Sequence, residues 1–158
     1  MVARGPVPRH CIPCSVVDPQ RMIFYGGTAP GSDGDEDGVR FFAYDLKARK
    51  LLYDGPDGPA RCMILAKSTG RVYWVPGNAE GSLRRFDPAT GGPPETLDVT
   101  IGIRAATEET PQGIVYAVSN GQGGKDPTLW SFDVRTEAVE AIGTAPVGTQ
   151  TYVATLDA

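Results

Sequence analysis

The segment RVYWVPGNAEGSLRRFDPATGG, from Arg71 to Gly92, decides the fold of this 158-residue chain. It begins with a run of β-branched and aromatic residues, Val72 to Val75, which ends at a Pro-Gly pair. A second run, Ser82 to Phe86, alternates between apolar and polar residues and ends at the turn residues Asp87 to Gly91. β-Branched and aromatic residues favour strands, whereas Gly, Asn, Asp and Pro favour turns. The segment therefore predicts two antiparallel strands joined by a loop.

The same unit occurs twice more along the chain, which predicts a repeat protein. An aromatic–Asp step marks the third strand of each unit, and the aspartates of these steps are 42 and 46 residues apart. The steps are Tyr44-Asp45, Phe86-Asp87 and Phe132-Asp133. We expect the aromatic ring to pack between neighbouring sheets, and the carboxylate to accept hydrogen bonds from backbone N–H groups of the following turn.

Four short strands in each repeat of about 40 to 50 residues is the period of a β-propeller blade. The chain is therefore predicted to be a single all-β domain, with about three and a half four-stranded antiparallel blades in an incomplete ring. The blades are expected at about residues 14–58, 59–100 and 101–147, with the start of a fourth at 148–158. A β-sandwich or barrel is the alternative, but it gives no reason for a repeated four-strand unit. No helical spacing of apolar residues is present, so very little helix is expected.

The composition limits the classes of partner. The apolar fraction of 41% is ordinary for a globular protein, and the 20 Gly and 14 Pro residues punctuate the apolar runs. A formal net charge of −4 provides no basic field, so binding to nucleic acid or to an anionic membrane is not expected. No apolar run approaches the roughly 20 residues that span a bilayer.

A resemblance to a known group of proteins rests on Val72-Tyr73-Trp74, on Leu83 to Gly91, and on their counterparts around Asp45 and Asp133. The chain resembles bacterial β-propellers of the broad quinoprotein-like, kelch-like and lactonase-like group, in which an aromatic-Asp-x-x-Thr/Lys-Gly turn links the third strand of a blade to the fourth. The resemblance covers nearly the whole chain from about Cys14 onward. It implies the fold rather than one function, because such blades serve enzymes, scaffolds and binding proteins.

The predicted number of blades has a consequence for partners. Propellers close with four to eight blades, so three and a half blades leave apolar sheet faces without a neighbour. We therefore expect either a fragment of a longer protein, whose remaining blades close the ring, or a part-ring that a second copy completes.

The acidic loop DGDEDG, which begins at Asp33, gives the sharpest local signal for a bound ion. This loop matches the start of a calcium loop, because it has carboxylates at positions 1, 3 and 5 and a Gly at position 6. The three carboxylates are Asp33, Asp35 and Asp37. Positions 9 and 12 are Phe41 and Tyr44 rather than carboxylates, so a solvated acidic loop is the alternative. Calcium is the one cofactor that the sequence predicts, with these three aspartates as its ligands.

The cysteines and the single histidine give weaker signals. Cys11, Cys14 and Cys62 are odd in number, which excludes a full disulfide framework. Cys11 and Cys14 have C-x-x-C spacing, but no helical pattern follows them, as a redox motif requires, and a zinc site lacks a second pair of ligands. We expect ordinary thiols, with Cys14 and Cys62 buried like small apolar residues. His10 is the only histidine, so no Ser-His-Asp triad can be drawn with it.

The remaining polar and aromatic candidates are expected to be structural. Glu108, Glu109 and Asp126 fall in loops and are predicted to be solvated. Trp74 and Trp130 fall in strands, where packing between blades is expected.

The expected function is a non-enzymatic module that binds a protein, a small molecule or a carbohydrate through its blade ends. The alternative is part of a propeller enzyme of lactonase or polysaccharide-lyase type, whose active site needs further blades. An enzyme should bring polar side chains from several first strands together at the channel. The polar residues of the predicted first strands and their ends are Ser15, Cys62, Lys67, Arg104, Thr107, Tyr152 and Thr155. This set is sparse for acid–base chemistry, so no catalytic residue is predicted.

Overall fold

The computed structural model describes residues 10–30, 39–76, 80–121 and 126–145. Within these ranges every regular element is a β-strand, and the strands form three antiparallel sheets of four strands each. The predicted all-β class and the three four-stranded antiparallel sheets are thus confirmed. No sheet closes on itself in the described ranges, and they contain no helix that could cross a membrane.

Each sheet is a meander in which strands adjacent in sequence are adjacent in space. The first sheet contains β1 (His10–Asp18), β2 (Ile23–Pro30), β3 (Arg40–Asp45) and β4 (Lys50–Pro56). The second contains β5 (Ile64–Leu65), β6 (Val72–Trp74), β7 (Gly81–Phe86) and β8 (Glu95–Ile101). The third contains β9 (Ala105–Ala106), β10 (Ile114–Val118), β11 (Thr128–Asp133) and β12 (Val139–Thr144).

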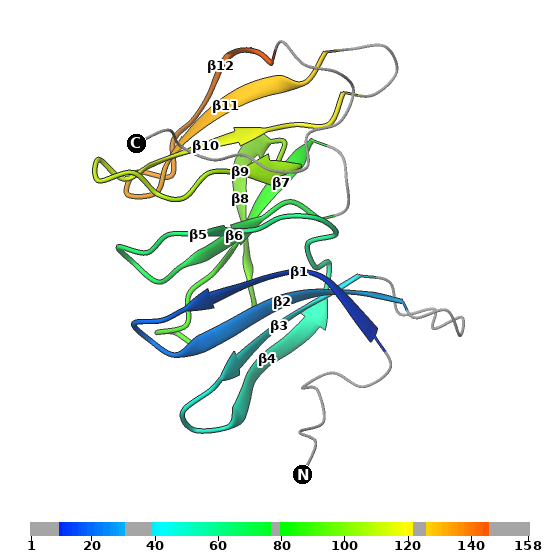
Figure 1. Cartoon of the computed structure of the whole chain (residues 1–158), viewed down its shortest axis with the longest axis vertical. Helices are drawn as coiled ribbons and strands as arrows, with labels where there is room; N and C mark the ends of the chain where they lie inside the picture. Colours follow the sequence, from blue (N-terminus) through cyan, green and yellow to red (C-terminus); the bar gives the residue numbers. More distant parts are fainter. Residues whose placement is uncertain (1–9, 31–38, 77–79, 122–125, 146–158) are drawn as a thin grey trace.

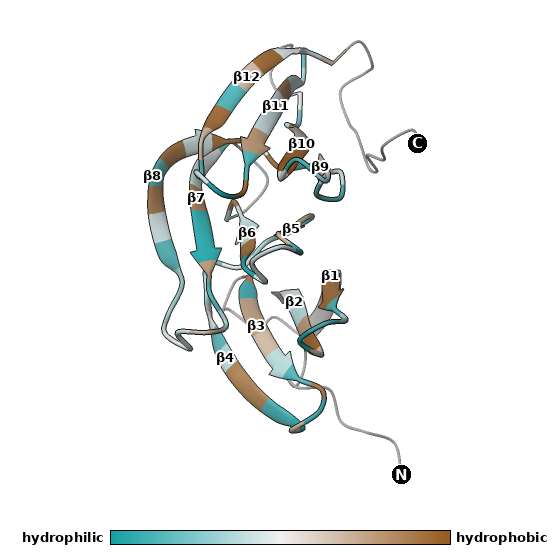
Figure 2. Cartoon of the chain, turned by 90° about the vertical axis from the view of Figure 1, so that its left-hand side faces the viewer, coloured by the Kyte–Doolittle hydropathy of each residue, from teal (hydrophilic) through white to brown (hydrophobic). Residues whose placement is uncertain are grey.

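The three sheets are stacked in sequence order, with the second sheet between the other two (Figure 1). Seen from the side, the first strands β1, β5 and β9 lie along one edge of the stack, and the fourth strands β4, β8 and β12 lie along the opposite edge (Figure 2). This arrangement gives the molecule an edge at which all three first strands meet.

The second sheet is buried on both faces because its side chains alternate between two cores. In β6, Val72 and Trp74 point toward the first sheet, whereas Tyr73, and Val75 directly after the strand, point toward the third. Successive strand residues face opposite sides of a sheet, so a strand that is covered on both faces is apolar at every position. This requirement explains the continuous apolar run that opens the Arg71–Gly92 segment.

Aromatic rings fill the core between the first and second sheets. Phe41 of β3 stacks on Trp74 of β6 with ring centroids 4.1 Å apart, and its ring lies 5.3 Å from that of Phe86. Tyr25 of β2 packs on the same rings and is fully buried. The core between the second and third sheets is mainly aliphatic, with Phe132 against Tyr73 at 4.9 Å. Trp74 and Trp130 both pack between sheets, as predicted.

The aromatic–Asp steps occupy the positions expected of them in the second and third sheets. Phe86 and Phe132 are buried between sheets. The carboxylates of Asp87 and Asp133 each accept a hydrogen bond from the backbone N–H two residues on, at 2.9 and 2.8 Å. The Asp45 carboxylate accepts instead from the N–H three residues on, at 2.6 Å.

Strand β1 is longer than the sequence predicts. The apolar run Ser15-Val16-Val17 predicts a first strand from Ser15, yet pairing with β2 begins at His10 and passes a register shift between Cys11 and Cys14. Pro13 lies inside this irregular segment. Proline lacks an N–H to donate and is tolerated at bulges and on edge strands, and β1 is the edge strand of its sheet. The apolar pattern alone does not reveal such a continuation.

Candidate functional site

A cavity of about 370 Å³ lies where the first strands of the three sheets meet. Its lining residues come from all three sheets and from the turns that follow their first strands. They are Ser15, Val16, Val17, Pro19, Met63, Leu65, Lys67, Ala106, Thr107 and Glu108. Ligand sites of proteins are typically concave, about 300–1,000 Å³ in volume, and lined mainly by apolar side chains with a few polar groups. The volume of this cavity lies in that range and its lining combines six apolar residues with four polar or charged ones, so we take it as the candidate functional site.

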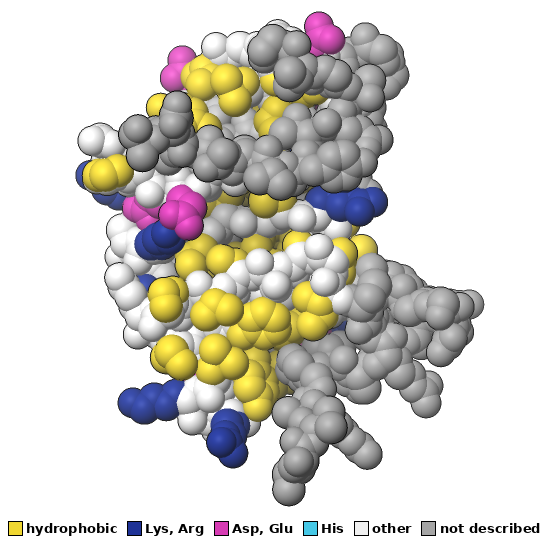
Figure 3. Space-filling view, in the orientation of Figure 1, with side chains coloured by type: hydrophobic (Ala, Val, Ile, Leu, Met, Phe, Trp, Pro, Cys, Tyr) yellow, Lys and Arg dark blue, Asp and Glu magenta, His cyan; other side chains and the backbone are white. Residues whose placement is uncertain are grey.

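The floor of the cavity is apolar and its rim is charged. Met63 and Leu65 belong to the buried core beneath the floor, and Val17 adds an apolar side chain that is 44% exposed. At the rim, Lys67 Nζ donates to Glu108 Oε2 at 2.7 Å, and both side chains reach solvent. Figure 3 shows hydrophobic side chains over β1 and β5 on this face, with oppositely charged groups beside them. The arrangement suits a ligand with an apolar body and a polar head.

The turn after β5 positions Lys67. Gly70 ends this turn with a positive φ of 79°, a conformation that glycine adopts without steric cost. The N–H groups of Thr69 and Gly70 donate to the Ala66 carbonyl, which closes the turn. Glu109, in the segment between β9 and β10, accepts a hydrogen bond from the Ser68 N–H at 3.0 Å. The segment after β9 thus holds the turn after β5 in place, and the two together form one side of the rim.

The turn after β1 forms the opposite wall and is held by a buried carboxylate. Asp18 accepts hydrogen bonds from the N–H groups of Gln20 and Arg21, at 2.9 and 3.0 Å, and from the Arg21 guanidinium at 2.9 Å. Burial alone would raise the pKa of Asp18, but these hydrogen bonds hold the pKa below its ordinary value. A charged Asp18 therefore fixes the turn that places Pro19 at the cavity.

Three polar residues predicted on the first strands do converge on the cavity, namely Ser15, Lys67 and Thr107. The Thr107 hydroxyl is engaged in the fold, because it donates to the Glu108 carbonyl and accepts from the Tyr116 N–H. Arg104 precedes β9 and is buried. Tyr152 and Thr155 lie outside the described residues.

The cysteines behave as thiols in packed surroundings rather than as reactive groups. The Cys14 thiol donates to the Pro59 carbonyl at 3.4 Å. Burial, and then the neighbouring Cys62, raises the pKa of Cys14 to about 12, and burial raises the pKa of Cys62 to about 11. The thiolate is the nucleophile and metal ligand, so both groups are unreactive at neutral pH. Both are half-buried and contribute to the two cores, which is less complete burial than predicted.

The predicted calcium ligands Asp33, Asp35 and Asp37 lie outside the described residues, so calcium binding stays a prediction. The side chains of His10 and Cys11 also lie outside them. Among the residues that the structure does describe, no group of three or more His, Cys, Asp or Glu side chains could hold a metal ion.

The loop carboxylates that were predicted to be solvated are so only in part. Glu108 and Asp126 are exposed, although Glu108 pairs with Lys67, whereas Glu109 is half-buried and accepts from the Ser68 N–H. Arg84 and Arg85 point to opposite faces of β7, where Arg84 pairs with Asp57 and Arg85 with Glu137. Sequence reasoning missed the apolar part of the cavity, because Val16, Met63 and Leu65 read as ordinary strand residues. The convergence of three first strands was the available signal.

Comparisons with known proteins concern the fold. No family model and no curated protein matches the chain. A structural genomics protein of unknown function from Bacteroides thetaiotaomicron is 14% identical, with a TM-score of 0.49 over 81% of this chain and 30% of that protein. The extracellular domain of a putative one-component system from the same organism is 16% identical, with a TM-score of 0.50 over 85% of this chain and 22% of that domain. This chain thus spans less than a third of the length of either.

Proposed function

We propose that this chain is an incomplete β-propeller of about three and a half blades that acts as a non-enzymatic binding module, with its ligand in the cavity at the first strands. The observation that supports this proposal is the cavity itself, to which the first strands or adjoining turns of all three sheets contribute. In a propeller the first strands surround the central channel, so a ligand bound there contacts several blades at once.

An equivalent tyrosine in each sheet supports the propeller arrangement. Tyr25, Tyr73 and Tyr116 each pair with the residue that precedes an aromatic–Asp step, so they occupy the same repeat position. Tyr25 is buried between the first and second sheets, and Tyr73 between the second and third. Val115 and Ala117 of β10 face the second sheet, so Tyr116 lies on the opposite face. In a propeller this tyrosine packs against the next blade.

The ring proposal predicts that the chain associates through these outer faces, since further blades come from a longer polypeptide or from a second copy. Sedimentation equilibrium of this chain should therefore give a mass above 16.8 kDa that rises with concentration. Tyr116→Lys should restore the mass of one chain, because a charge cannot be buried in an apolar interface without a partner. Thr100→Lys, at an exposed position of β8 in the middle sheet, is the control and should leave association unchanged, because it does not lie on an outer face. A monomer at all concentrations would contradict the proposal.

The cavity proposal predicts a single binding site for a small amphipathic anion. The probe is 8-anilinonaphthalene-1-sulfonate, whose rings match the apolar floor and whose sulfonate matches Lys67. Val17→Glu should weaken its binding at least about tenfold, because a carboxylate at the cavity wall repels the sulfonate and makes the wall polar. Ile142→Glu is a matched control, since Ile142 of β12 is also 44% exposed but does not line the cavity. Fluorescence titration measures both affinities, and equal losses in the two variants would place the probe elsewhere.

A further inference from the structure

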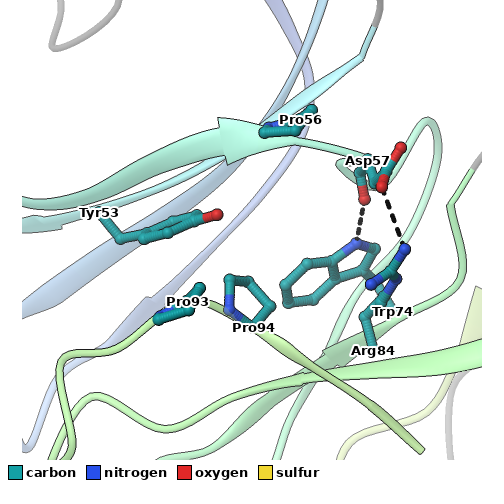
Figure 4. A pocket seen from close by; sticks show the side chains of 7 residues that line it. All are labelled: Tyr53, Pro56, Asp57, Trp74, Arg84, Pro93 and Pro94. Carbon is teal, nitrogen blue, oxygen red and sulfur yellow. Dashed lines mark hydrogen bonds and ion pairs between the residues drawn. The ribbon is translucent and has the colours of Figure 1, made fainter.

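A second, smaller cavity lies near the opposite edge of the stack, between the first and second sheets, and plays no part in the site described above. Its volume is about 150 Å³, which is room for one ring-sized group. The residues around it come from the end of β4 and from β6, β7 and the segment before β8 (Figure 4). They are Tyr53, Pro56, Asp57, Trp74, Arg84, Pro93 and Pro94.

The walls of this cavity are rings. Figure 4 shows the Tyr53 ring on one side, Pro93 and Pro94 on another, and the Trp74 indole beyond them. Trp74 is 1% exposed, so only Tyr53 and the prolines offer an accessible surface to a ligand. Such rigid, flat apolar surfaces lose little conformational entropy on binding. They suit a ligand that is itself a compact ring.

The polar end of the cavity offers hydrogen-bond acceptors. The Trp74 Nε1–H donates to the Asp57 carbonyl at 2.7 Å. The Arg84 guanidinium donates to the Asp57 Oδ2 atom at 3.0 Å and also to the Thr96 hydroxyl, and these two bonds use only some of its five N–H groups. The Asp57 carboxylate has about four acceptor positions and a side chain that is 61% exposed. A ligand that fits this end can donate hydrogen bonds to Asp57 and accept them from Arg84, as a hydroxyl group does.

The charges at this end balance. Asp57 and Arg84 are directly paired, so neither a cation nor an anion meets an uncompensated opposite charge there. Asp57 has a positive φ of 57°, which is uncommon for a residue other than glycine. The contacts with Trp74 and Arg84 hold this conformation and fix the carboxylate before any ligand arrives. The site is thus preorganised for a neutral ligand.

We propose that this cavity binds one neutral hexopyranose residue, with an apolar face of the sugar ring on Tyr53 and the prolines and with sugar hydroxyls donating to Asp57. A sugar ring combines a compact shape, an apolar face and several O–H donors without net charge. A proline-rich peptide would also fit aromatic and proline walls. Prolyl residues have no N–H to donate, however, so such a peptide would cover Asp57 without bonding it.

The test measures the binding of methyl β-D-glucopyranoside, methyl β-D-galactopyranoside and methyl α-D-mannopyranoside to the whole chain by saturation-transfer NMR. At least one should bind with a dissociation constant of about 1 mM, as expected for a ligand of this size. Asp57→Gly should weaken binding at least about tenfold, because glycine keeps the positive φ and the carbonyl that Trp74 bonds but removes the acceptor. Asp126→Gly, at an exposed loop position in the third-sheet region, is the matched control and should bind like the unaltered chain.

A second variant tests the same site in case Asp57→Gly fails to fold. Pro93→Trp changes an exposed residue and fills the cavity, and it should abolish binding while circular dichroism stays unchanged. Absence of binding by all three glycosides would overturn the proposal, as would binding that neither Asp57→Gly nor Pro93→Trp weakens. Preferential binding of a decaproline peptide that Pro93→Trp removes would overturn it in favour of peptide recognition.

Discussion

Phe41→Ala should lower the free energy of unfolding by about 3–5 kcal/mol, the range measured for large-to-small changes at buried aromatic positions. Phe41 is fully buried and contacts rings from both sheets, including Trp74 at 4.1 Å and Phe86 at 5.3 Å. Removal of this ring leaves a space bordered by other rigid rings, which cannot collapse to fill it. Urea unfolding followed by circular dichroism measures the change.

The control for this prediction is Leu51→Ala in β4. Leu51 is an exposed apolar residue of the same sheet, so its truncation should change stability by no more than about 0.5 kcal/mol. If Phe41→Ala proved as mild as Leu51→Ala, the first and second sheets would not share a packed core. A large loss with cooperative unfolding would show that the two sheets are stable only together.

Local features of this fold could be predicted from the sequence because they depend on residues close together in the chain. The run from Val72 and the turn at Asp87 reflect strand alternation and turn chemistry, so the two strands of the opening segment were found as β6 and β7. The inward packing of Trp74 follows from the same alternation. Strand limits were less predictable, because β1 continues through the irregular segment around Pro13.

The candidate sites depend on the packing of sheets, and this part could not be predicted. Asp57 lies in a Gly-Pro-Asp-Gly segment that reads only as a turn, yet its carboxylate pairs with Arg84, 27 residues later. Glu108 reads as a solvated charge and Lys67 as a polar residue at the end of a first strand, and they are brought together from positions 41 residues apart. Neither pairing can be recognised from the local sequence, because each depends on the spacing between sheets rather than on strand periodicity.

Glu137→Ala should lower the free energy of unfolding by about 1–3 kcal/mol. Glu137 lies in the turn between β11 and β12 and joins the third sheet to the second. Its Oε1 atom accepts from the Tyr73 hydroxyl at 2.9 Å, and its Oε1 and Oε2 atoms both accept from the Arg85 Nη1 group, at 2.8 and 2.9 Å. Arg71 lies 3.6 Å away. The Glu137 side chain is 20% exposed, so the loss should be smaller than for a fully buried ion pair.

A further variant distinguishes the contribution of the Glu137 carboxylate from that of the Glu137 backbone conformation. Glu137 has a positive φ of 61°, so Glu137→Gly removes the same hydrogen bonds but relieves backbone strain, and it should cost less than Glu137→Ala. Glu140→Ala, at an exposed position of β12, should change stability by less than about 0.5 kcal/mol. A double-mutant cycle with Arg85→Met isolates the coupling between the two charges. No coupling in that cycle would mean that solvent screens the pair, and that the Arg85–Glu137 ion pair does not help to join the second and third sheets.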